Sequence, residues 1–421
     1  MSNLTVSSRG SLSRDARLLL AASGLFALPF YGIQMVLRVL YVLRLGYGPE
    51  YVGLFSSVGA FAYMGMGLPS GALGRRFGIR QTMLAGGAIT VVGMALFPFT
   101  EFLPAWAQDA WPIATQVVRT VGWSMFSVNL IPALTAATAI AQRSRIYSLN
   151  GMLKGLGTFL GTVTGGLLPG LFSGLLSRPL DAPRPYGAAL WVAAAISVSA
   201  LVPLFRVGRL EAQAVEEQAE AQGPFPWLIV GLLVLHVYLS HGGWVMHQSF
   251  ASAYMDAALL LPTSAIGLII GLGQFAAMLS PLLNPRLARR WGDGWTLSVT
   301  ALGISASLLP MALSSHWPAV AVGSIGVLSL SAMWMPALQV FQMEQVEPRW
   351  RSLAYGTLST AMGLSFASMS LLGGYVIAGI GYRALFAIGA GISVAGAGLM
   401  WAILKGQKTG LKPQMNTDTH R

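Results

Sequence analysis

A stretch of 28 residues occurs twice in this chain, and the two copies begin 214 residues apart. The first copy runs from Tyr51 to Gly78 and reads YVGLFSSVGAFAYMGMGLPSGALGRRFG; the second runs from Ala265 to Gly292 and reads AIGLIIGLGQFAAMLSPLLNPRLARRWG. Eleven positions are identical without a gap, including three glycines and a pair of arginines in each copy. Because the spacing is close to half of the 421 residues, we interpret the chain as a duplicated unit whose halves share one fold.

A weaker correspondence has a spacing of 208 residues. It aligns the predicted fifth and eleventh helices and matches Arg143 with Arg351, Gly155 with Gly363, and Gly165-Gly166 with Gly373-Gly374. The two spacings differ by about six residues, which loop variation in a duplicated unit explains.

The chain is apolar almost throughout, with 54% hydrophobic and 10% charged residues. A soluble domain needs a charged surface, so the solvent for most of this chain is lipid. A bilayer core about 30 Å thick requires roughly 20 apolar residues per helix, and such windows occur twelve times. The predicted fold class is therefore an all-α membrane protein with twelve spans in two pseudo-symmetric six-helix bundles. The predicted spans are 18–43, 49–72, 81–99, 111–138, 147–172, 186–205, 225–250, 263–283, 295–313, 317–342, 353–377 and 383–404.

A polar stretch in the middle of the chain separates the two bundles. It reads RVGRLEAQAVEEQAEAQGP, and its composition favours a short surface helix, although a disordered tether fits it equally well. No small-residue cleavage site precedes the first span, so we expect this span to be retained. The predicted parts are an N-terminal tail (1–17), a first bundle (18–205), a central loop (206–224), a second bundle (225–404) and a C-terminal tail (405–421).

The positive charges are distributed unevenly between alternate loops. Of the 26 Lys and Arg residues, 19 lie in the two tails and in every second loop, 4 lie in the alternate loops, and 3 lie within spans. This bias marks the cytoplasmic side and places both termini there. The net charge of +12 is therefore interpreted as a topological determinant facing anionic headgroups, and no nucleic-acid partner is expected. The chain has no cysteine, which excludes disulfides and thiolate metal sites.

The loop after the second predicted span reads GALGRRFGIR and contains Gly71, Leu73, Arg75, Arg76, Gly78 and Arg80. It resembles the G-x-L-a-D-r-x-G-r-k motif of the major facilitator superfamily, which joins the second and third helices in that family. Arg289, Arg290 and Gly292 look like the degenerate second copy that the family carries. The resemblance covers roughly residues 18–404. It implies the twelve-helix fold of the superfamily and a transporter whose two bundles rock about a central site.

One position departs from that motif. Arg75 stands where the family has an acidic residue that helps to hold the inward face closed. Glu344 and Glu347, at the expected cytoplasmic end of the span 317–342, are available partners for Arg75 and Arg76 across the two bundles. Two interpretations stay open: these residues form a gate, or the arginines only fix the topology, since exposed ion pairs contribute about 0 to 1 kcal/mol.

Two further patterns resemble superfamily exporters. The span 147–172 holds Gly157, Gly161, Thr162, Gly165 and Gly166, similar to G-x-x-x-G-P-x-x-G-G with threonine in place of proline. Glycines spaced by four let another helix approach closely, which suits a sliding contact but is also ordinary membrane-helix packing. Arg119, followed by Thr-Val-Gly, resembles the R-x-x-q-G pattern of the same proteins, but the glycine stands one position early and the glutamine is absent. Only Arg119 is carried over, as a candidate proton-relay or substrate-binding residue.

Apart from charged residues at the ends of helices, three charged residues are embedded within predicted spans, and all three are basic: Arg38, Arg119 and Lys154. An Arg or Lys at the bilayer centre costs about 2.5 to 3.5 kcal/mol, so a residue kept there faces a wet cavity or a partner. By helical rise, Arg38 and Arg119 can share one layer toward the outer side, while Lys154 lies toward the inner side. Snorkelling to the interface is the alternative for Arg38 and Lys154. On the first helix, helical steps predict one cavity-facing stripe made of Tyr31, Gln34, Arg38 and Tyr41.

The seventh span corresponds to the first under the 214-residue spacing, and it is rich in polar residues. His241, Trp244 and Gln248 recur at steps of three and four and predict a second cavity-facing stripe. Because an imidazole titrates near neutral pH, His241 is the candidate proton carrier, with a packing histidine as the alternative. His236 and His247 are too far apart for a shared metal site, and no metal is expected. Further wall candidates on the tenth span are Trp334, Gln339 and Gln342.

The sequence predicts a secondary transporter that works by alternating access. The resemblance implies proton-coupled efflux of amphipathic compounds, whereas basic residues without an embedded carboxylate favour organic anions. A non-transporting sensor on the same fold is a third interpretation. No nucleotide-binding loop or hydrolase motif lies in a span, so neither an enzyme nor a cofactor or nucleotide is expected. The expected partners are a small-molecule substrate, the lipid bilayer and protons, for a monomer in the plasma (bacterial inner) membrane.

Overall fold

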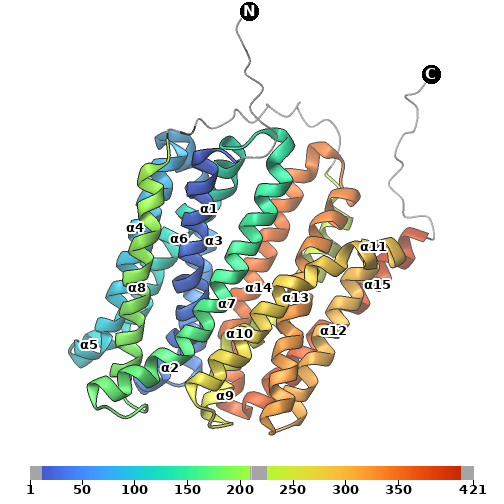
Figure 1. Cartoon of the computed structure of the whole chain (residues 1–421). Coiled ribbons are helices and arrows are strands. Elements are labelled where there is room, and N and C mark those ends of the chain that lie inside the picture. The colour runs from blue at the N-terminus through green and yellow to red at the C-terminus, as the bar shows by residue number, and fades with distance from the viewer. Residues whose placement is uncertain (1–11, 209, 211–224, 409–421) are drawn as a thin grey trace, which may run out of the picture.

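The computed structural model describes residues 12–208, 210 and 225–408, and within them the chain is built of helices joined by short loops (Figure 1). Among these described residues, twelve helical segments are long and apolar enough to cross a membrane. The predicted all-α fold with twelve spans is thereby confirmed. The two alternatives for the central loop, a surface helix and a tether, concern residues 211–224, which lie outside the described part of the chain.

The first half of the chain makes six crossings. The first is continuous through three segments, and the third and fifth include short 3-10 turns. In chain order the elements are α1 (Arg14–Ala27), η1 (Leu28–Ile33), α2 (Gln34–Arg44), α3 (Pro49–Phe77), α4 (Ile79–Leu96), η2 (Phe97–Phe102), α5 (Ala105–Gln108), α6 (Ala110–Ala136), η3 (Ile140–Gln142), α7 (Arg143–Leu176) and α8 (Pro183–Arg206).

The second half makes six more crossings, of which the eighth in the chain is interrupted by a 3-10 turn. Its elements are α9 (Trp227–Ala257), α10 (Thr263–Leu279), η4 (Ser280–Leu283), α11 (Asn284–Trp291), α12 (Asp293–Leu313), α13 (Trp317–Gln345), η5 (Pro348–Trp350), α14 (Arg351–Ile380) and α15 (Tyr382–Lys408). Several helices extend past the predicted spans; α9, for example, continues from the predicted end at residue 250 to Ala257. Hydropathy detects only the apolar part of a helix, and these ends carry polar residues.

The two repeated stretches end on glycines whose backbone geometry explains why glycine stands there. Gly78 has φ of 92° and Gly292 has φ of 82°. This is the left-handed region, which strains any residue with a Cβ. Each glycine turns the chain directly from one crossing into the next, α3 into α4 and α11 into α12. The arginines of both copies therefore lie at one end of the bundle, which is uppermost in Figure 1 and is called the basic end below.

Other glycines of the repeats allow the two halves to touch backbone to backbone. A Cβ on Gly53 of α3 would lie 2.5 Å from Ser370 O and 3.2 Å from Gly374 Cα on α14. A Cβ on Gly267 of α10 would lie 2.6 Å from Gly166 Cα on α7. The two contacts are related by the internal repeat and both lie near the end opposite the basic end, where only glycine permits so close an approach.

Within the first half, the first crossing packs closely against glycines of α7. Pro29 has no N–H to donate, and the segment Leu28–Ile33 around it winds as a π-helix. A Cβ on Gly161 would collide with Leu28 O and would lie 2.9 Å from Gly32 Cα. Gly157 and Gly165 lie against the same crossing, at Gly24 and Ile33. Of the glycines in the exporter-like pattern, these three therefore pack within one half, and Gly166 packs between the halves.

The two halves contact each other at the end that lies opposite the basic end, which is called the opposite end below. At the basic end there is space between helices. Tyr186 Oη lies 2.9 Å from Thr263 Oγ1, and this contact joins the halves at the opposite end. At the basic end, a cavity of about 630 Å³ opens beside α13 and α14. Cβ atoms added to Gly71, Gly151 or Gly356, near the basic ends of α3, α7 and α14, would meet no atom within 4 Å. The close glycine contacts therefore do not continue to the basic end.

We predict that Gly161→Ala lowers the stability of the protein. The new methyl group meets backbone atoms of η1 that cannot move aside, and such overpacking costs about 1 to 3 kcal/mol. The midpoint of thermal unfolding in detergent measures the effect. Gly170→Ala on the same helix is the matched control, because its Cβ meets nothing within 4 Å and alanine favours the helix. Equal midpoints for the two variants would contradict the close approach of η1 to α7.

Candidate functional site

The central feature of the first half is a pair of guanidinium groups, one half-buried (Arg38) and one buried (Arg119), that share one amide oxygen. Arg38 Nη1 donates to Gln116 Oε1 at 2.8 Å, and Arg119 Nε donates to the same oxygen at 3.1 Å. Arg38 comes from α2, whereas Gln116 and Arg119 lie one turn apart on α6. The two arginines expected to share a layer meet at this oxygen. We call Arg38, Gln116 and Arg119 the arginine pair site.

Aromatic rings cover the arginine pair site. The Arg119 guanidinium carbon lies 4.5 Å from the centre of the Phe30 ring, and that of Arg38 lies 5.6 Å from the Phe55 ring. Phe30 stacks on Trp123 at 3.9 Å between ring centres, and Trp123 Nε1 donates to Tyr31 Oη at 3.2 Å. A cation over an aromatic face gains about 0.5 to 2 kcal/mol, more when water is excluded. The rings therefore replace part of the water that the two cations lose.

In the part of the chain that the structure describes, no acidic side chain pairs with these cations. Within the described residues neither Arg38 nor Arg119 forms an ion pair, and Arg119 is 5% exposed with Nη1 buried and without a partner. Two like charges that share one neutral acceptor repel each other, and buried charges are normally paired. The site therefore carries a positive charge that an anion would complement.

Gln116 was not predicted as a site residue. Its polar side chain stands three residues before Arg119 in an apolar helix, and that spacing is the signal that could have found it. Its 6% exposure reflects the room that Gly59 leaves on α3, since a Cβ there would collide with the Gln116 amide. Gln116 therefore sets the position of both guanidiniums.

The predicted stripe on the first crossing is only partly formed. Tyr31 lies beneath Lys154, whose Nζ is 4.2 Å from the centre of the tyrosine ring. Gln34 is fully buried, and neither of its amide atoms has a partner. The prediction for Tyr41 is wrong: it is fully buried inside the first half and donates to Pro98 O at 2.9 Å. Gln34, Arg38 and Tyr41 share the regular helix α2, and the Tyr41 ring packs edge-on against Phe97 of the same half, 5.2 Å between ring centres, which keeps it in the interior. The π-helix at Leu28–Ile33 changes only the register of Tyr31 relative to these three residues.

The seventh crossing, α9, presents two kinds of polar residue. His241, Trp244 and Gln248 are half-buried on one face, and Gln248 Oε1 has no partner. His236 and His247 are buried on other faces, where His236 Nδ1 lies 2.9 Å from Gly396 O and His247 Nε2 lies 2.7 Å from Ser324 Oγ. Trp334 of α13 is 3% exposed, and its ring centre lies 6.2 Å from that of His241. In the described part of the chain no cluster of His, Asp or Glu could hold a metal ion.

The residues of the two arginine motifs occupy the surface of the basic end. Arg75, Arg76, Arg289 and Arg290 are exposed, and among the described residues none of the four forms an ion pair. Arg80 instead donates to Phe205 O at 2.8 Å, which satisfies a carbonyl group at the end of α8. The predicted contact of Arg75 and Arg76 with Glu344 is not made in this conformation, and the gate remains a hypothesis.

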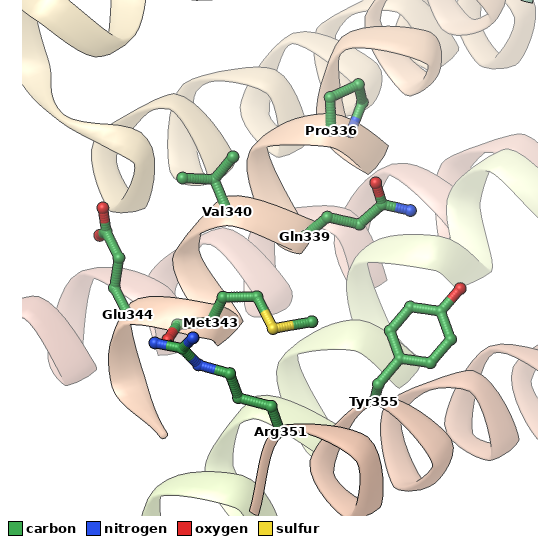
Figure 2. A pocket seen from close by; sticks show the side chains of 7 residues that line it. All are labelled: Pro336, Gln339, Val340, Met343, Glu344, Arg351 and Tyr355. Carbon is green, nitrogen blue, oxygen red and sulfur yellow. The ribbon is translucent and has the colours of Figure 1, made fainter. Parts of the chain in front are cut away.

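The cavity of about 630 Å³ lies at the basic ends of α13 and α14, and none of the arginines of the two motifs lines it. Figure 2 shows its lining: Pro336, Gln339, Val340, Met343, Glu344, Arg351 and Tyr355. Arg351 donates to Met343 O at 3.1 Å and so fixes the end of α13. Glu344 lines the cavity and is exposed. The cavity is a mouth at the basic end and does not include the arginine pair site.

An ion pair between the halves closes the opposite end. Arg44 at the end of α2 donates twice to Asp256 near the end of α9, at 2.7 and 2.6 Å. The side chains of this pair are 18% and 8% exposed, and Arg44 also donates to Leu180 O and Tyr186 Oη. The pair was not predicted, because the predicted seventh span ends at residue 250 and leaves Asp256 in a loop. We call Arg44 and Asp256 the latch.

Comparisons with known proteins identify relatives of this architecture. Residues 19–255 and 233–417 match the sequence profile described as Major Facilitator Superfamily. A search of curated proteins gives no match.

Several solved structures share the fold at low identity. The nucleoside transporter NupG superposes with a TM-score of 0.75 at 14% identity, covering 92% of this chain and 99% of its own. A bacterial homolog of the human lysosomal transporter Spinster, in an inward-facing and occupied conformation, gives 0.73 at 14%, covering 96% and 100%. The human organic anion transporter MFSD10 gives 0.62 at 16%, covering 92% and 99%. Likeness at such identities concerns the fold.

We predict that Asp256→Asn opens the end that the latch closes. Because the chain has no cysteine, a single Met35→Cys change creates one labelling site, at the place where Met35 Sδ faces Gln274 of the other half. If the closed state loses about 1.4 kcal/mol of stabilisation, the equilibrium between the closed and open states of this end shifts tenfold toward the open state. Labelling of the introduced thiol by a membrane-impermeant maleimide applied from the opposite end is therefore expected to become about tenfold faster.

The control exchanges the two charges. Arg44→Asp combined with Asp256→Arg keeps an ion pair at this place, so slow labelling is expected to return. An unchanged labelling rate in Asp256→Asn would show that other contacts keep this end closed.

Proposed function

The chain belongs to the major facilitator superfamily, and on this premise we propose that it transports amphipathic organic anions. As a member of the family it is a secondary transporter that works by alternating access, so the open question is what it carries. The observation that carries the proposal is the arginine pair site: the half-buried Arg38 and the buried Arg119, from different helices, both donate to one neutral amide oxygen, and among the described residues neither forms an ion pair. A bound carboxylate, sulfonate or phosphate would complete their hydrogen bonds and balance their charge.

The surroundings of the site support an amphipathic substrate. Phe30, Tyr31 and Trp123 form an aromatic cluster beside the guanidiniums, and the half-buried Trp244 is an aromatic residue of the other half on the predicted cavity face of α9. Apolar walls with a few fixed polar groups are typical of sites for small organic molecules. The Lys154 ammonium over the Tyr31 ring places a further positive charge on the side toward the basic end.

We assign the basic end to the cytoplasm of a cell whose plasma membrane holds the protein. The excess of Lys and Arg in the loops of this end supports that orientation. The conformation is then inward-facing, with the latch closed and the cavity beside α13 and α14 as the cytoplasmic mouth. An anionic substrate in the cytoplasm would meet Arg351 at this mouth before it reaches Lys154 and the arginine pair site.

Proton-coupled efflux of amphipathic compounds without a requirement for negative charge is the second candidate. The observation that favours it is the half-buried His241 beside Trp244 at 4.8 Å between ring centres, a titratable group on the predicted cavity face. Export and proton coupling belong to this proposal and are tested by the same transport assay.

We predict that Arg119→Gln reduces anion transport about 10- to 100-fold. A hydrogen bond to a charged group contributes about 1.5 to 3 kcal/mol, and the glutamine side chain cannot balance a bound anion. Purified protein in liposomes is tested for counterflow of radiolabelled aromatic carboxylates and, separately, of lipophilic cations, with and without an imposed proton gradient. Arg178→Gln, which removes an exposed charge at the opposite end, is the control and is expected to retain the wild-type rate.

Each alternative gives a different result in this assay. Counterflow of cations that survives Arg119→Gln would contradict the anion proposal and support the second candidate. Saturable binding without exchange of any compound would support the sensor interpretation. A proton gradient that drives anion movement in the wild type, but not in His241→Gln, would assign the coupling step to His241.

A further inference from the structure

Two neighbouring aromatic rings of the first crossing each carry a cation. The Arg119 guanidinium carbon lies 4.5 Å from the centre of the Phe30 ring, and the Lys154 Nζ lies 4.2 Å from the centre of the Tyr31 ring. The two ring centres are 5.1 Å apart. The charges of Arg119 and Lys154 are therefore no further apart than these three distances placed end to end. We call Phe30, Tyr31, Arg119 and Lys154 the two-cation platform.

The Lys154 side chain points into the bundle. Its neighbour Leu153 lies beside Gly24 of the first crossing, because a Cβ on Gly24 would be 3.5 Å from Leu153 Cβ. The first crossing starts at the basic end, and Tyr31 follows Gly24 by seven residues, which places it about 10 Å deeper. To reach the Tyr31 ring, the lysine extends toward the bilayer centre, whereas snorkelling would direct it to the basic end.

The Lys154 side of the platform faces the space that leads to the mouth at the basic end. Lys154 is exposed although its ammonium lies over a ring of the first crossing. Tyr63 of α3 is 40% exposed and interacts electrostatically with both Lys154 and Tyr355. Tyr355 of α14 lines the cavity of about 630 Å³ (Figure 2). An anion that enters through this mouth therefore passes Lys154 before it reaches Arg119.

The charge of Lys154 has no counterpart in the described part of the chain. The ammonium forms no ion pair there, and the same holds for Arg38 and Arg119. A charge removed from bulk water without a partner is unfavourable. One acidic group bound at the arginine pair site leaves Lys154 unbalanced, because the Phe30 and Tyr31 rings lie between the two cations. The platform is therefore complementary to two acidic groups with an apolar spacer.

We propose that the transported anion is a dianion, such as an aromatic dicarboxylate. One acidic group binds at the arginine pair site, the second binds Lys154, and the spacer lies along the rings of Phe30 and Tyr31. This inference rests on the proposed function and specifies its substrate class. Lys154 is then a specificity-determining residue, since its charge-assisted contact is made with a dianion and is lost with a monoanion of the same skeleton.

The test compares matched probes on the purified full-length protein by isothermal titration calorimetry. Two pairs differ only in the second carboxylate and cover two lengths: benzoate with terephthalate, and biphenyl-4-carboxylate with biphenyl-4,4′-dicarboxylate. In at least one pair the second carboxylate is expected to raise the affinity about tenfold or more. In Lys154→Gln this advantage is expected to fall to about twofold or less, while the monocarboxylate binds as before. Lys154→Arg, which keeps the charge, is expected to retain most of the advantage.

Two further variants are controls for the role of Lys154. Lys405 Nζ also lies over an aromatic ring, 4.3 Å from the centre of Trp401 on α15 of the second half. Lys405→Gln removes the same charge from the same kind of contact and is expected to keep the full advantage. Arg119→Gln is expected to weaken the binding of both members of each pair, because both use the arginine pair site. The unfolding midpoint of Lys154→Gln in detergent shows that this variant is folded.

The outcomes distinguish the two proposals. Equal affinities within both pairs, or a tenfold advantage that survives Lys154→Gln, would overturn the dianion inference, while Arg119-dependent binding of benzoate would still support the anion site. Binding that Arg119→Gln leaves unchanged, or binding of no probe at all, would instead overturn the proposed function and this inference with it.

Discussion

The close approach of helix backbones at glycine is the contact on which the rest of this structure depends. Helices in lipid gain no hydrophobic free energy by associating, so they are held by packing, and packing is closest where no side chain intervenes. Gly53 against Gly374 and Gly166 against Gly267 bring the halves together twice, at positions related by the internal repeat. Because both contacts lie near the opposite end, the helices have room to diverge toward the basic end, where the cavity lies.

The arginine pair site shows how a membrane protein retains cations without acids. Inserting one Arg near the bilayer centre costs about 2.5 to 3.5 kcal/mol, and a cation–π contact returns about 0.5 to 2 kcal/mol. The Gln116 oxygen contributes one acceptor, which the two guanidiniums divide between them. These terms offset the cost of Arg119 only in part, since its Nη1 still lacks a partner. On the proposed function, a bound anion would supply the missing partner and balance the charge, and a site that is only partly compensated without it suits transient binding.

The fold could be predicted because its signals, the apolar windows and the internal repeat, are visible in the sequence itself. The contacts of the site join residues that are distant in the sequence, and no local pattern marks them. Apolar windows identify crossings whatever their neighbours are, and the repeat identifies the halves. Arg38 and Arg119 were found because charges in lipid are rare, but the polar Gln116 that joins them is an ordinary residue until two helices place arginines beside it. The latch was missed because α9 runs past its apolar window, and only this extension brings Asp256 to Arg44. The stripe on the first crossing was wrong at Tyr41 because helical steps give a residue's face but not its neighbours, and here Pro98 O and the Phe97 ring hold the tyrosine inside the first half.

The arginine pair site and the latch differ in whether their residues belong to the same half and so move together. Arg38, Gln116 and Arg119 all belong to the first half, so a rocking motion between the halves leaves their hydrogen bonds intact. Arg44 and Asp256 belong to different halves, so the same motion must separate them. The latch lies at the end of the bundle, where water can solvate the separated charges, whereas separated charges in the bilayer core would have no such replacement. The cations of the core are thereby kept within one half, and the ion pair that must break is placed at the surface.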